Sequence, residues 1–141
     1  MKNPIIDSIR QTTHPIREWM EMFAEYDPDI LTAWHEMAQK LMKHKELDLK
    51  TREFIIVAID AVEAWPYIDV HIDQAFELGA SIQELIEVMV VAGFVKGPHA
   101  WAWGLSHLSK MIQRRKEAGF ATPRSRVDVT SDAERHRPIY P

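Results

Sequence analysis

Cysteine is missing from this chain of 141 residues, and its absence excludes several kinds of chemistry. Without thiols the protein forms no disulfide bonds and no cysteine metal sites. A cysteine nucleophile is excluded for the same reason. Freedom from disulfides is typical of cytoplasmic proteins, and we expect a cytoplasmic location.

The sequence also lacks a long apolar run and an excess of positive charge. No uninterrupted apolar stretch is long enough to span a bilayer, and the first residues lack the apolar core of a signal peptide. The formal net charge is -4, whereas nucleic-acid binding depends on clustered lysine and arginine. We therefore expect neither a membrane nor a nucleic-acid partner, but a small-molecule substrate.

Apolar residues recur at helical spacing along most of the chain, and no useful length of strand alternation is present. The length favours a single domain. The pattern predicts an all-α, single-domain bundle of about six helices. We expect an N-terminal arm over residues 1–13, the helical domain over 14–120, and a C-terminal extended arm or disordered tail over 121–141.

Helix boundaries are clearest in the central part of the chain. Asp48 is a predicted N-cap, with Thr51 as the competing candidate. Pro66 suits the first turn of the next helix, where a missing N–H costs nothing. Ser81 and Glu84 have the spacing of a capping box and predict the start of a third helix, which we expect to reach Gly93.

The same central stretch carries a set of short motifs in a fixed order. They are Arg52-Glu53 with an apolar run, His71 followed by Ala75, Gly79, and the capping box leading into Glu84-Leu85-Ile86-Glu87. In order and spacing they resemble the carboxymuconolactone decarboxylase and alkylhydroperoxidase-D-like family. The resemblance implies that family's helical fold and its assembly into trimers or hexamers, so we expect a homo-oligomer.

The chain departs from the family's peroxidase branch, which uses a Cys-x-x-Cys before the histidine. Those two positions are Ala64 and Tyr67 here, so thiol peroxidase activity is excluded. Glu53 also lies about one residue closer to His71 than in that branch. The resemblance to the decarboxylase branch implies loss of carbon dioxide from a small lactone acid without a cofactor.

His71 is the predicted proton-transfer residue, because imidazole moves protons near neutral pH and because the family's catalytic members share this histidine. The alternative is a buried histidine with a structural hydrogen bond. Glu53 and Tyr67 are expected to assist, although a carboxylate also suits the first turn of a helix for electrostatic reasons alone. Asp60 or Glu63 could orient His71.

Substrate-binding candidates come from the loop before His71 and from the region around Gly97. Trp65 is expected to wall a pocket for a small cyclic molecule. Three basic residues could hold a substrate carboxylate: Arg52, Lys96 and His99. The last candidate is an aromatic residue, Trp101. The alternative for the aromatic residues is core or subunit interface, and we place Trp101 and Trp103 at or near such an interface.

Two other patterns need an interpretation. Asp69, Asp73 and Glu77 repeat along one helix and are typical of a solvated face. Metal ligation would need the histidines to converge, with Glu63 or Glu87 completing the set: His71, His99 and His107. No helical pair of them has metal-binding spacing, so we expect neither a metal nor a cofactor.

We therefore expect a cofactor-independent lyase, decarboxylase or isomerase acting by proton transfer on a small carboxylated lactone or ring compound. The alternative is a non-catalytic ligand-binding or assembly protein of the same fold. A metal-dependent enzyme is the third possibility.

Overall fold

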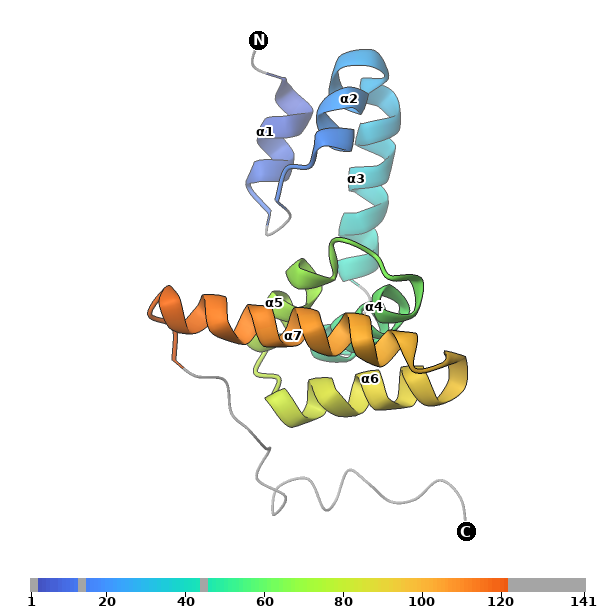
Figure 1. Cartoon of the computed structure of the whole chain (residues 1–141). Helices are drawn as coiled ribbons and strands as arrows, with labels where there is room; N and C mark the ends of the chain where they lie inside the picture. The colour runs from blue at the N-terminus through green and yellow to red at the C-terminus, as the bar shows by residue number, and fades with distance from the viewer. Residues whose placement is uncertain (1–2, 13–14, 44–45, 122–141) are drawn as a thin grey trace. The chain divides into compact units, whose positions relative to one another are not determined.

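The computed structural model describes residues 3–12, 15–43 and 46–121 (Figure 1). These residues form seven α-helices and no strand, which confirms the all-α class. The helices are α1 (Pro4–Arg10), α2 (Glu18–Tyr26), α3 (Pro28–Met42), α4 (Leu49–Glu63), α5 (Ile68–Glu77), α6 (Ile82–Lys96) and α7 (His99–Glu117). Within the described ranges, no helix is both long enough and apolar enough to cross a membrane. The predicted C-terminal arm or tail lies outside the described residues, except for residue 121.

The chain divides between residues 47 and 48 into two compact units. In the first unit, α1, α2 and α3 each pack against the other two. Asn3 caps α1 by accepting a hydrogen bond from the Ile5 amide, and Pro4 occupies the first helical position. A short helix therefore lies within the segment for which the sequence predicted only an arm. The predicted domain limits at residues 14 and 120 stay predictions.

In the second unit, α4 packs against α5, α6 and α7, and α7 in turn contacts the other three helices. Consecutive helices α6 and α7 lie side by side and run in opposite directions (Figure 1). Gly97 makes the turn between them with a φ of 114°, which L side chains rarely adopt. The central place of α4 makes it the scaffold for the residues that follow.

Side-chain caps mark the starts of α4 and α6. Asp48 accepts a hydrogen bond from the Thr51 amide at 2.7 Å, so Asp48 is the N-cap. The predicted capping box of Ser81 and Glu84 is confirmed, with both reciprocal hydrogen bonds present. Pro66 lies in the turn before α5, because the helix begins two residues later. Helix α6 continues three residues beyond the predicted end at Gly93.

The acidic stripe of α5 keeps part of its predicted exposure, but all three of its carboxylates are ion-paired to α7. Asp69 accepts hydrogen bonds from His107 at 2.5 Å and from Arg114 at 2.8 Å, both on α7. Arg115 of α7 bonds Asp73 and Glu77 through its two terminal nitrogens. These ion pairs attach α5 to α7 along most of the length of α5.

Arg115 is the most enclosed member of this network. Its guanidinium is buried and lies 5.5 Å from the ring centre of Phe76 and 4.6 Å from that of Phe120. Arg114, by contrast, binds a single carboxylate and is largely exposed. The two neighbouring arginines therefore form a matched pair for a stability test.

We expect Arg115→Ala to lower the free energy of unfolding by about 1–3 kcal/mol, because a buried charged hydrogen-bonding group and its aromatic packing are both lost. Arg114→Ala should cost less than about 1 kcal/mol, since exposed ion pairs contribute little. Urea unfolding followed by circular dichroism measures both. Equal effects of the two substitutions would contradict this assignment.

Candidate functional site

A buried carboxylate and a histidine form the centre of the candidate site. Nδ1 of His71 on α5 lies 2.8 Å from Oε2 of Glu53 on α4. Glu53 is only 1% exposed, and the His71 side chain is 19% exposed. A carboxylate at Nδ1 fixes the ring orientation and leaves Nε2 for a reacting group. The structure thus brings together two of the predicted catalytic residues, and Glu53 takes the orienting role considered for Asp60 or Glu63.

Glu53 reaches this position through the helical repeat of α4. Glu53, Val57 and Asp60 are spaced by four and three residues, so their side chains share one face of the helix. All three are buried. The exposed Glu63 ends the helix and belongs to none of the contacts described at the site. Sequence reasoning named Asp60 only as a possible orienting group.

Asp60 is 8% exposed, and its Oδ2 has no hydrogen-bond partner among the described residues. Burial raises the pKa of Asp60 to about 6; the nearby His71 lowers it, and the Glu53 carboxylate raises it further. Buried carboxyl oxygens without a partner are rare in folded proteins. Asp60 is therefore a titratable group with an unused hydrogen-bonding atom beside the Glu53–His71 pair.

The loop between α4 and α5 begins at Ala64, one helical turn after Asp60. Ala64 adopts the left-handed conformation with a φ of 50°, and the Trp65 amide donates to the Asp60 carbonyl at 2.9 Å. Trp65 and Tyr67 meet edge to face with their ring centres 5.7 Å apart. The Trp103 indole donates to the Trp65 carbonyl at 3.3 Å. Trp65, the predicted wall residue, and Tyr67, the predicted assisting residue, thus lie together on a loop anchored to both α4 and α7.

The predicted carboxylate-binding residues are more scattered. Nε2 of His99 donates to the Val62 carbonyl at 3.2 Å, while Lys96 is exposed at the end of α6. Arg52 is buried on α4. Because Arg52 directly precedes Glu53, the two side chains point about 100° apart around the helix axis. The structure does not gather these three groups, and their role in substrate binding stays a prediction.

Trp101 lies on α7, and its side chain contacts α6. Its indole nitrogen donates to the Val90 carbonyl at 3.3 Å. A Cβ atom at Gly93 would lie 2.1 Å from that nitrogen, so only glycine leaves room for the ring. Trp101 therefore packs α7 against α6, and its predicted contact with substrate stays untested.

The three histidines of the possible metal site have separate partners. His71 pairs with Glu53, His99 with the Val62 carbonyl, and His107 with Asp69. Over residues 3–12, 15–43 and 46–121 no group of three or more potential ligands could hold a metal ion. The ligand set considered for a metal-dependent enzyme is therefore not assembled in this part of the protein.

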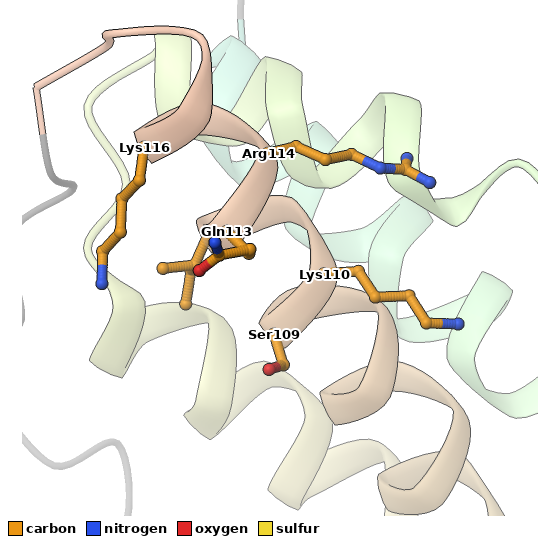
Figure 2. Close-up of a pocket in the computed structure, with 6 residues that line it drawn as sticks. Ser109, Lys110, Gln113, Arg114 and Lys116 are labelled. Carbon is orange, nitrogen blue, oxygen red and sulfur yellow. The ribbon is translucent and has the colours of Figure 1, made fainter.

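A surface hollow lies on the second half of α7 (Figure 2). It is lined by Ser109, Lys110, Ile112, Gln113, Arg114 and Lys116. Lys116 points to one side of the helix, whereas Lys110 and Arg114 point to the other (Figure 2). The three cations do not converge, and no predicted site residue lines the hollow.

The raised pKa of Asp60 predicts how stability depends on pH. Between its ordinary value of 3.8 and about 6, the folded state holds a proton that the unfolded state releases, so stability falls as pH rises through this window. Asp60→Asn removes this effect and should stabilise the protein at pH 7 by up to about 3 kcal/mol, but not below pH 4. Urea unfolding at both pH values measures the difference. A less stable Asn variant at pH 7 would contradict it.

Comparisons with known proteins agree with this architecture. A family model described as the carboxymuconolactone decarboxylase family matches residues 28–106, more than half of the chain. The crystal structure of a putative carboxymuconolactone decarboxylase from Burkholderia xenovorans LB400 superposes with a TM-score of 0.70 and 26% sequence identity. The match covers 82% of this chain and 96% of that one. A search of curated proteins found no match. The matched range contains Glu53, Asp60 and His71, and the chain belongs to the carboxymuconolactone decarboxylase family.

Proposed function

We propose that this protein is a cofactor-independent lyase, a decarboxylase or isomerase, that acts by proton transfer on a small carboxylated lactone or ring compound. The observation that carries the proposal is the buried Glu53–His71 pair, at 2.8 Å, within the family-matched region. A histidine oriented by a carboxylate is suited to general acid–base catalysis. Family membership supports the decarboxylase-like reaction class.

The chemistry asks little of the protein. When the bond to the carboxylate breaks, its electron pair delocalises into a conjugated carbonyl, and the resulting anion must be stabilised and then protonated. His71 is the proton-transfer residue at the anion, and Glu53 holds its ring in place. Tyr67 assists with its hydroxyl, and Trp65 helps to exclude water from the reacting group.

The second candidate function is a non-catalytic binding or assembly protein, favoured by the apolar outer face of α6. Its exposed apolar side chains include Val91, Phe94 and Val95, and Phe94 is 86% exposed. Trp101 adjoins this face through its contacts with α6. A contiguous apolar surface of this kind is typical of protein interfaces. We expect the face to join copies of this chain in a homo-oligomer, whether or not the protein is an enzyme.

Catalysis is tested by ligand-detected NMR with a panel of small carboxylated lactones and aromatic acids. We expect wild type to convert at least one compound, and His71→Ala to fold but lose at least about 100-fold in turnover, because the acid–base group is gone. His107→Gln is the matched control. It removes another histidine paired with a carboxylate, but one that attaches α5 to α7.

The two variants separate chemistry from positioning of α5. Retained turnover in His107→Gln beside its loss in His71→Ala supports catalysis by His71. Full activity of His71→Ala would remove the enzyme proposal. Binding of a compound by wild type without any conversion would support the second candidate function.

Assembly is tested at the α6 face. Phe94→Asp places a charge in the proposed interface and should shift the oligomer to monomer at micromolar concentration, because an unpaired buried charge is strongly unfavourable. Met37→Asp on α3 is the control, since Met37 is also exposed, at 63%, but lies in the other unit. Analytical ultracentrifugation measures both. Monomeric wild type would contradict the assembly proposal.

A further inference from the structure

We propose that Asp60 is a second proton-transfer residue of this site, and that its carboxyl group delivers the proton to the substrate carbon that has lost carbon dioxide. This inference rests on the proposed function and assigns a division of labour within it. His71 stabilises the oxygen on which negative charge collects, and Asp60 protonates the carbon.

The unused oxygen of Asp60 is the first observation. Oδ2 is buried and has no hydrogen-bond partner in the described part of the chain. Asp60 as a whole is only 8% exposed. Leaving such a group unsatisfied costs about 1–3 kcal/mol. The substrate carbon would engage this group in the transition state, as it takes the proton.

The position of Asp60 is the second observation. It shares a face of α4 with Glu53, about 10.5 Å further along the axis at the usual helical rise. His71 acts electrostatically on Asp60 but gives its Nδ1 hydrogen bond to Glu53. The Asp60 carbonyl also anchors the loop that carries Trp65. His71 and Asp60 are therefore close enough to act on each other, next to the loop that carries Trp65.

Protonation of Asp60 is consistent with this role. Two titratable groups act electrostatically on the Asp60 carboxyl. They are His71 on α5, which packs on α4, and Glu53 on α4 itself. Burial favours its neutral form, and a negatively charged substrate nearby would favour that form further. Two titratable groups in different environments are the usual basis for separate acid and base roles.

The proposed step balances without a further reactant. The carbon–carbon bond to the carboxylate breaks, carbon dioxide leaves, and the electron pair moves into the conjugated carbonyl, whose oxygen is stabilised by His71. The electron pair then returns from the carbonyl to the carbon and takes the Asp60 proton to form the new C–H bond, while the electrons of the broken O–H bond remain on the Asp60 carboxylate. Water reprotonates Asp60 after product leaves.

The test compares wild type, Asp60→Asn and Glu63→Gln on whichever carboxylated lactone wild type converts. We expect Asp60→Asn to lower kcat by about 100-fold or more and to change KM by less than about threefold, because only the transition-state interaction is removed. Glu63→Gln changes an exposed carboxylate one helical turn away and should keep kcat within about twofold. Asp60→Glu should restore part of the activity.

A pH profile adds a readout that a purely structural role would not alter. Wild-type kcat should fall as the pH rises and Asp60 loses its proton, and this limb should be missing from the residual activity of Asp60→Asn. Asp60→Asn with kcat within about threefold of wild type, or with a change in KM alone, would overturn the inference but leave the proposed function intact. If wild type converts none of the panel, the proposed function fails and the assignment of Asp60 fails with it.

Discussion

The hydrogen bond between Glu53 and His71 is the contact on which the rest of the site depends. It joins α4 to α5 at 2.8 Å and buries a carboxylate in the core of the second unit. Such a bond is useful for chemistry only if both helices are held to within a fraction of an ångström. The network between Asp69, Arg115 and their partners holds α5 from the side of α7. Helix α5 is thus fixed on two sides, and the ring of His71 with it.

Features that depend on neighbouring residues could be predicted from the sequence. The N-cap at Asp48 and the capping box at Ser81 involve side chains and amides only three residues apart, so their spacing carries the information. The ion pairs of the acidic stripe were missed because the partners of its carboxylates lie far along the chain. Arg114 is 45 residues from Asp69, and a stripe of carboxylates looks the same whether water or arginine lies opposite.

The candidate site was predictable in its residues but not in its contacts. The motif identified Glu53 and His71, whereas their pairing across 18 residues depends on how α5 packs against α4. Trp101 was predicted to bind substrate and to lie at or near a subunit interface, and neither prediction named its contact with α6. The structure places its ring over Gly93, a close approach that only the packing of α7 on α6 reveals. Short spacings thus identify chemistry-bearing residues, and long-range packing decides which of them meet.

Asp60 differs from three other described carboxylates of the second unit. Glu53, Asp69 and Asp73 have histidine or arginine partners and connect helices. Asp60 has an oxygen without such a partner, and burial without one destabilises its ionised form. An apolar residue at this position would continue the face begun by Val57 and would carry no such penalty. A buried carboxyl oxygen that joins no other element is well placed for chemistry, because functional sites are where proteins depart from the most stable sequence.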